Sequence, residues 1–420
     1  MSVNQIIALY EIPTNLLTAK LFDDKYSKIL SKINKLIIDT EEVKPSEYYT
    51  FKKKGIHSIY IILNTQLNSM QNLFSDCFHL KEVDLSNLLT SKLTSMSGLF
   101  QRCISLSYID FTNIDSSNVL DMQKMFLGCN KLKELDLTAF NTSKVKDMNN
   151  LFSACSNLEK IIFSEKFDTS NVENMNDMFS FCSQLKEIDL SKFNTSKVKN
   201  MSKLFYSCKK IECLNLDNFE TSNVENMSQM FSYCTNLNLI FFSEKIITNK
   251  VKYMNNMFDS CEKLNFIDLS NFNTESVENM NFMFYGCESL SNLDLSNFNI
   301  EQVKTMRNMF HNCKSLIMLD LSNFKDNNFV EDLNYMFSGC DSLIKLDLGN
   351  FKNEKEANLE YMFEGCINLN NIDMGKFDFN KVKNTEGIFK GIPEEGSIIC
   401  NKSFKNKLIR LLPGGWEKVI

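Results

Sequence analysis

Apolar residues recur along most of the chain in blocks of 26 or 27 residues, each reading approximately T-S-x-V-x-x-M-x-x-M-F-x-x-C-x-x-L-x-x-I-D-L-S-x-F. One cysteine marks each block, and these twelve ladder cysteines are Cys77, Cys103, Cys129, Cys155, Cys182, Cys208, Cys234, Cys261, Cys287, Cys313, Cys340 and Cys366. Eight of the eleven intervals between them are 26 residues and three are 27. Such a period is typical of solenoids, in which each repeat buries its apolar face against its neighbours.

Each block contains two different apolar patterns. Between Val198 and Cys208, apolar residues are spaced by three or four, which predicts one face of a short helix. Thr195 and Ser196 precede it, where hydroxyls can cap free amides. The segment LxxIDLS, for example residues 185–191, alternates and predicts a short strand. The chain is therefore expected to form an α/β leucine-rich-repeat solenoid of about 12 units, with a parallel sheet on its concave face and short helices on the other side.

The residue after the repeat valine alternates in charge from block to block. These residues are Lys146, Glu173, Lys199, Glu225, Lys252, Glu278, Lys304 and Glu331. If equivalent positions stack about 5 Å apart, each charge lies between two of opposite sign. Because Ser170 and Glu173 also match a capping box, local helix capping is the alternative explanation.

The two ends of the chain depart from the repeat. We expect residues 1–68 to form an N-terminal cap with a partial repeat, 69–392 the array, and 393–420 a C-terminal cap. Strands are predicted in "KLIID", in "EYYTF" and at 59–63, followed by a helix carrying Met70 and Phe74. The tail predicts a strand, an amphipathic helix and a Pro-Gly-Gly-Trp turn, in which Trp416 either covers the last repeat or serves as a binding aromatic.

Composition excludes several function classes. The 420 residues carry a net charge of −6, with arginine only at Arg102, Arg307 and Arg410, which argues against a nucleic-acid partner. The sequence contains no apolar run of about 18 residues, so we expect no membrane span. The N-terminus lacks the pattern of a signal peptide, which favours a cytoplasmic location and reduced thiols.

The thiols predict neither a cofactor nor a metal site. Each repeat supplies one cysteine, no CxxC pair occurs, and the chain has only three histidines. The ladder cysteines are expected to be buried, with disulfides between neighbouring thiols as a weaker alternative. Cys213 lies off the ladder on an outward strand position, where we expect an exposed thiol. No histidine lies near it in the sequence, so we expect no catalytic residues and no enzyme.

The segment "NTSKVKNMSKLFYSC", together with "LDLSNFN", resembles the BspA-like leucine-rich-repeat family, in the DUF285-like subgroup with TSNVxxMxxMFxxCxxLxxLDLSxF repeats. The resemblance covers about residues 56–392, and the closing "LLPGGW" is similar to the ends of such proteins. It implies a protein-binding solenoid, since members are found on bacterial surfaces and in anaerobic protists and are discussed as surface antigens and adhesins for host or matrix proteins. The resemblance therefore favours a cell-surface location, whereas the N-terminal sequence favours a cytoplasmic one.

Outward strand positions form the expected working surface. One column is acidic in nine repeats: Asp84, Asp110, Asp136, Asp189, Asp268, Asp294, Asp320, Asp347 and Asp373. Three explanations remain open for it. The carboxylates can bond to nearby Ser and Asn groups, attract a basic partner, or bind calcium, which needs more oxygens than one carboxylate per repeat supplies.

Apolar residues interrupt these polar columns at a few positions. They are Cys213, Leu239, Phe241, Phe266 and Met318, the first four on three consecutive repeats. A patch of a few hundred Å² of exposed apolar surface usually marks a contact. We therefore predict a hot spot for a protein partner, which can be a host, matrix or intracellular protein, bound by a monomer. Two alternatives remain for the patch: a cap or loop covers it, or it reflects simple repeat drift. Two alternatives remain for the function: a passive coat protein without a partner, or a metal-dependent protein.

Overall fold

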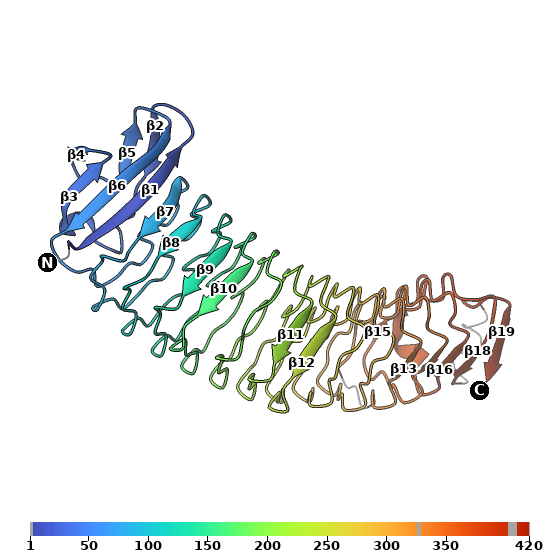
Figure 1. The fold of residues 1–420 in the computed structure, drawn as a ribbon. Helices are drawn as coiled ribbons and strands as arrows, with labels where there is room; N and C mark the ends of the chain where they lie inside the picture. Colours follow the sequence, from blue (N-terminus) through green and yellow to red (C-terminus); the bar gives the residue numbers. More distant parts are fainter. Residues whose placement is uncertain (1–2, 326–328, 402–409, 420) are drawn as a thin grey trace. The chain divides into compact units, whose positions relative to one another are not determined.

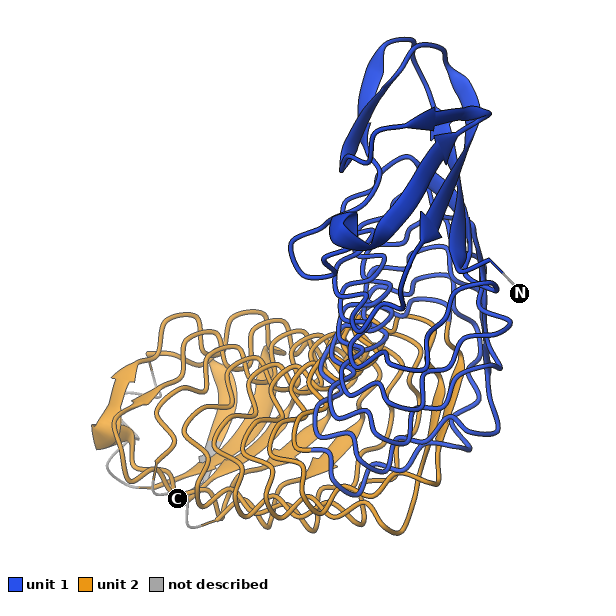
Figure 2. Cartoon of the chain, turned by 90° about the vertical axis from the view of Figure 1, so that its left-hand side faces the viewer, with its two compact units in different colours: residues 1–198, 207–210 blue, residues 199–206, 211–420 orange. Residues whose placement is uncertain are grey.

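The computed structural model describes residues 3–325, 329–401 and 410–419. The chain divides into two compact units (Figure 2). Unit 1 comprises residues 1–198 with 207–210, and unit 2 comprises 199–206 with 211–420. Both contain stacked coils, one coil for each repeat (Figure 1). The domain boundaries predicted at 68/69 and 392/393 stay predictions.

Unit 1 begins with an antiparallel sheet that continues into the first coils. Its order is β4-β3-β6-β1-β7-β8, and its antiparallel strand β1 pairs with both β6 and β7. The strands of unit 1 are β1 (Gln5–Ile12), β2 (Leu17–Lys20), β3 (Ile33–Ile38), β4 (Glu41–Val43), β5 (Tyr48–Phe51), β6 (Gly55–Leu63), β7 (Leu80–Asp84), β8 (Tyr108–Asp110), β9 (Glu134–Leu137) and β10 (Lys160–Phe163), with a 3-10 turn, η1 (Leu30–Lys32). The three strands predicted before the array are therefore confirmed as β3, β5 and β6.

Unit 2 carries parallel strands where its coils are regular enough for a strand to be assigned. Its sheets are β11-β12, β13-β14-β16-β18-β19 and β15-β17. The bounds are β11 (Cys213–Leu216), β12 (Leu239–Phe242), β13 (Met318–Asp320), β14 (Lys345–Asp347), β15 (Ala357–Asn358), β16 (Asn371–Met374), η2 (Phe379–Lys381), β17 (Val382–Asn384), β18 (Glu395–Cys400) and β19 (Gly415–Val419). The side chain of Trp416 is 4% exposed and its Nε1 donates to the carbonyl of Pro393 at 2.9 Å, so it covers the preceding coil. The amphipathic helix predicted in the tail falls mostly on residues outside the described ones.

The short helices predicted in each repeat are wrong, and the coils form a β-solenoid. Two residues in each coil have left-handed backbone, such as Lys124 (φ 56°) and Gly128 (φ 76°). Each is the third residue of a β-turn, which is closed by the amide of Met125 or Cys129 donating to the carbonyl three residues earlier. Successive turns reproduce the spacing of three and four that a helix would give. Within the described residues the helical segments are the two 3-10 turns, η1 and η2.

Hydrogen bonds to the next coil take the place of helical ones. The amides of Met122, Lys124 and Phe126 donate to carbonyls of the following coil at 2.9–3.2 Å. A helix would use the same amides within its own segment. The coil therefore satisfies its backbone through its neighbour, which explains why a single repeat has no stable structure alone. The cap helix predicted at Met70 and Phe74 is also replaced by turns.

Hydroxyls at the predicted helix cap instead join adjacent coils, so the capping prediction is wrong as well. The Oγ1 of Thr274 donates to the carbonyl of Asn299 at 2.7 Å and accepts the amide of Asn299 at 2.7 Å. Thr142 and Ser116 make the same pair of bonds to Asp168 and Asn141. The side chain of Thr274 is fully buried, and its hydroxyl pairs both of these part-buried backbone groups of the next coil.

The core is a ladder of stacked phenylalanines and buried thiols. Ring centroids in adjacent coils lie 5.4–6.1 Å apart, from Phe74 to Phe179 in unit 1 and from Phe205 to Phe389 in unit 2. Each ladder thiol from Cys103 to Cys366 donates to a phenylalanine carbonyl of the preceding coil at 2.9–3.2 Å. Burial raises the pKa of the Cys155 and Cys313 thiols to about 12. The predicted burial of the ladder cysteines is confirmed, and no disulfide links any of the described cysteines.

The alternating charges after the repeat valine link adjacent coils where a lysine and a glutamate side chain form an ion pair. The amide of Lys304 donates to the carbonyl of Glu278 at 2.9 Å, and the two side chains form an ion pair at 2.5 Å. The pKa of Glu278 is lowered by the hydrogen bond and charge of Lys304, with a smaller effect of Lys252 in the preceding coil. Because no helix follows the repeat serine, the capping-box explanation does not apply.

Candidate interaction surface

The acidic column lies on the exposed side of the strand ladder, at or near the end of each assigned strand that contains one of its residues. Every one of the nine carboxylates accepts the backbone amide two residues later at 2.8–2.9 Å. These bonds, with bonds from serine side chains, lower the pKa of Asp189, Asp268 and Asp294. Each aspartate thus closes a turn through one oxygen, and the lowered pKa keeps Asp189, Asp268 and Asp294 ionised at neutral pH.

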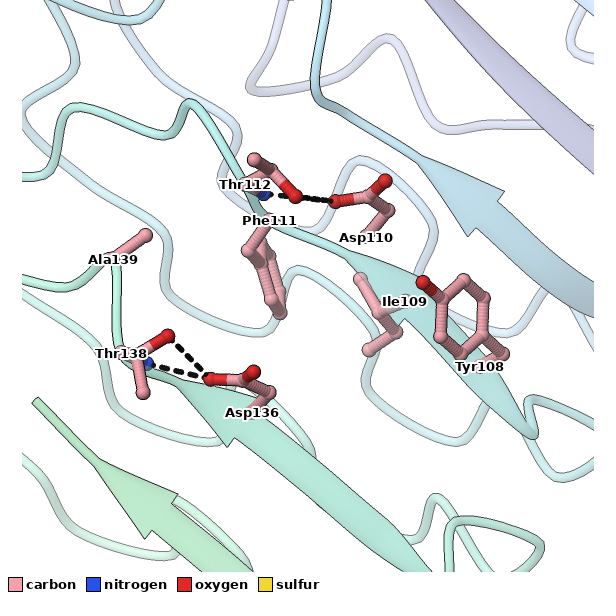
Figure 3. A pocket seen from close by; sticks show the side chains of 8 residues that line it. All are labelled: Tyr108, Ile109, Asp110, Phe111, Thr112, Asp136, Thr138 and Ala139. Carbon is pink, nitrogen blue, oxygen red and sulfur yellow. Dashed lines mark hydrogen bonds between the residues drawn. The ribbon is translucent and has the colours of Figure 1, made fainter.

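A hollow on this face in unit 1 lies between β8 and β9 (Figure 3). Its volume is about 340 Å³, and its lining residues are Tyr108, Ile109, Asp110, Phe111, Thr112, Asp136, Thr138 and Ala139. Thr112 and Thr138 donate both amide and hydroxyl to Asp110 and Asp136. One oxygen of each carboxylate that lines this hollow is thus engaged in closing a turn of its own coil.

The described residues contain neither a metal-binding cluster nor a membrane-spanning helix. Among them, no group of three or more His, Cys, Asp and Glu side chains is placed to hold a metal ion. No helix in the described part of the chain is long and apolar enough to cross a membrane.

Unit 2 brings four of the five predicted contact residues onto three consecutive coils. Cys213 pairs with Leu239 in the register of β11 and β12, and Asn215 pairs with Phe241. The coil of Phe266 follows, since Tyr253 and Asn279 bridge these two coils in parallel. Phe241 is 47% exposed and Phe266 58%, Cys213 is exposed, and Leu239 is half-buried. Met318 is 67% exposed and lies two coils beyond Phe266.

The structure adds two exposed residues that the sequence prediction missed. Ile317 and Ile344 are 45% and 48% exposed, and the amide of Ile344 donates to the carbonyl of Ile317 at 3.3 Å. They occupy the position just before the outward column of Met318. In earlier coils of unit 2 this position is polar, as at Asn238, Asn265 and Ser291, so the same search for interruptions of a polar column would have found them.

The exposed thiol predicts a simple chemical result. Cys213 is exposed and the other thirteen cysteines are buried. Because burial keeps the ladder thiols protonated and inaccessible, we expect Ellman's reagent to modify one thiol rapidly in the native protein and all fourteen in denaturant. A Cys213→Ser variant is the control and should show no rapid reaction. Rapid modification of several thiols in the native protein would contradict the buried ladder.

Comparisons with known proteins extend along most of the array. The family model described as "Mycoplasma protein of unknown function, DUF285" matches residues 68–164, 132–241, 201–324 and 317–396. No curated protein matches the chain. Similar solved structures include a leucine-rich repeat protein from Bacteroides ovatus, at 16% identity and a TM-score of 0.42 over 84% of this chain and 95% of that one. A TLR13–ssRNA13 complex is 14% identical, with a TM-score of 0.19 over 80% of this chain and 67% of that one. At these TM-scores neither structure supports an inference about this protein.

Proposed function

The chain belongs to the family described as Mycoplasma protein of unknown function, DUF285, and from its own surface we propose that it is a non-enzymatic solenoid that binds a protein partner through the strand face of unit 2. A repeat solenoid suits this role because its stacked strands present one continuous surface. The resemblance to BspA-like proteins favours adhesion to a host or matrix protein. An intracellular scaffold uses the same surface, and the compartment of the partner distinguishes the two.

One observation carries the proposal. Phe241 and Phe266 are large, exposed and apolar at positions where most coils carry Asp or another polar residue. Leu239 lies against Cys213 beside them, and ionised Asp268 and Asp294 lie in the next coils. Apolar side chains surrounded by charged ones are typical of a protein contact, in which a few central residues supply most of the binding energy.

A pull-down tests the proposal with a triple variant, Leu239→Lys, Phe241→Lys and Phe266→Lys. Wild-type protein is expected to retain a partner from native cell extract or from matrix proteins, and the triple variant is expected to retain at least tenfold less. Circular dichroism first establishes that both are folded. The matched control is Tyr108→Lys, which replaces a residue that is 57% exposed on the strand face of unit 1. Equal retention by the triple variant would overturn the proposal, and an absence of saturable binding by wild type would favour a passive coat protein.

A further inference from the structure

The exposed apolar residues of unit 2 lie on a diagonal of the strand face. We call Phe241, Leu239, Phe266, Met318, Ile317 and Ile344 the apolar diagonal. Phe241 occupies the aspartate position of its coil, Leu239, Phe266 and Met318 lie two residues earlier, and Ile317 and Ile344 three residues earlier. The exposed apolar position thus moves toward the start of the strand as the coils proceed from Phe241 to Ile344. A partner must follow this line.

The length of the diagonal follows from strand geometry. Four steps between coils, at about 4.8 Å each, give about 19 Å along the stack. Three residues at about 3.3 Å give about 10 Å across it. The diagonal is therefore about 22 Å long and inclined at roughly 30° to the stacking direction. At 1.5 Å per residue, an α-helix of about 15 residues has the same length.

The two sides of the diagonal differ in charge. On the side of the strand ends lie Asp268, Asp294 and Asp320, all exposed. Hydrogen bonds from the backbone and side chains of Ser270 and Ser296 lower the pKa of the first two, which keeps them negative at neutral pH. On the other side lie Asn238 and Asn265, which are neutral. The matching partner is basic on one flank only.

Two polar side chains along the diagonal, Asn292 and Lys345, further specify the partner. Asn292 is exposed between Phe266 and Met318, so the partner residue above it should be small or polar. Lys345 pairs with Met318 in the register of β13 and β14. A positive charge there favours the negative C-terminal end of a helix. The expected order is two apolar contacts, one small polar residue and two apolar contacts.

A helix suits this face better than an extended segment. The diagonal crosses the middle of the strands and does not follow a free sheet edge. A strand laid on such a face would find no backbone partners beneath it, whereas a helix satisfies its own amides and carbonyls. We infer that the apolar diagonal binds an amphipathic α-helix of a protein partner, about 15 residues long, with an apolar stripe and lysine or arginine along one flank. The inference rests on the proposed function and specifies its partner class.

Synthetic peptides test the inference on the full chain. The probe is a dye-labelled 15-residue peptide with leucine at i, i+4, i+11 and i+14, serine at i+7, lysine on one flank and glutamine on the other. Two control peptides keep the length: one has the same composition with the stripe scrambled, and one carries glutamate in place of lysine. Fluorescence anisotropy should show at least tenfold tighter binding of the lysine peptide than of either control. The difference from the glutamate peptide should shrink at high salt, because exposed charges are screened.

Substitutions in both halves of the apolar diagonal separate this inference from the proposed function. Phe241→Lys and Met318→Lys should each weaken binding of the lysine peptide at least tenfold, and Tyr108→Lys should leave it unchanged. Equal affinity for the striped and scrambled peptides, or wild-type affinity in Met318→Lys, would overturn the helix inference. If the triple variant still loses its partner in the pull-down, the proposed function stands alone. If the triple variant retains the partner, the proposed function itself fails.

Discussion

Replacing Phe284 by alanine is expected to lower the free energy of unfolding by about 3–5 kcal/mol. The Phe284 ring is fully buried and stacked between Phe258 and Phe310, at centroid distances of 5.5 and 5.7 Å. Its removal loses the transfer free energy of the ring and opens a cavity that the coils on both sides cannot close without breaking their hydrogen bonds to each other. Urea unfolding followed by circular dichroism measures the change in stability.

The matched control is Phe266→Ala, which is the same substitution on the exposed strand face of the preceding coil. Phe266 is 58% exposed, so its loss should change the free energy of unfolding by less than about 0.5 kcal/mol. A loss at Phe266 as large as that at Phe284 would show that the strand face is covered in the native protein. This was the alternative in which a cap or loop folds over the patch.

Replacing Thr274 by valine should cost about 2–4 kcal/mol, although the two side chains have nearly the same shape. The substitution removes the hydroxyl that bonds both the amide and the carbonyl of Asn299. Two part-buried backbone groups then lose this partner, at about 1–2 kcal/mol each. The urea midpoint of unfolding measures the effect. Thr274→Ser is the control, because Ser116 already makes both bonds in another coil and the hydroxyl is retained. A valine variant as stable as the serine variant would contradict the role of the hydroxyl.

The sequence predicts the period, the strands and the burial of the thiols, because each depends on which residues are apolar. It does not predict the path of the chain between Val198 and Cys208. Lys203 and Ser207 there have left-handed backbone, at φ 56° and 60°, which neither residue type favours. Their conformation is held by the adjacent coil, as where the amide of Lys203 donates to the carbonyl of Ser228. Contacts with a neighbour override local preference, and no pattern within one repeat records them.

The candidate site was predictable in part for a related reason. Exposed residues such as Phe241 and Phe266 interrupt a regular column, and the repeat itself supplies the expected residue at each position. The sequence prediction considered only the alternating positions of each strand. Ile317 and Ile344 lie just before these positions, so it did not include them. The repeat also explains why the aspartate column is difficult to interpret from sequence. Its carboxylates close turns in nine coils, and the same groups present negative charge to a partner.

The affinity of Phe266→Ala for a partner that wild-type protein retains tests the central claim most directly. Phe266→Ala removes only an exposed ring, so the variant is folded and any loss of affinity belongs to the surface. Titration of the purified partner should show binding at least tenfold weaker than that of wild type, with the unfolding midpoint unchanged. Unchanged affinity in the folded variant would contradict the assignment of the binding surface to the strand face of unit 2.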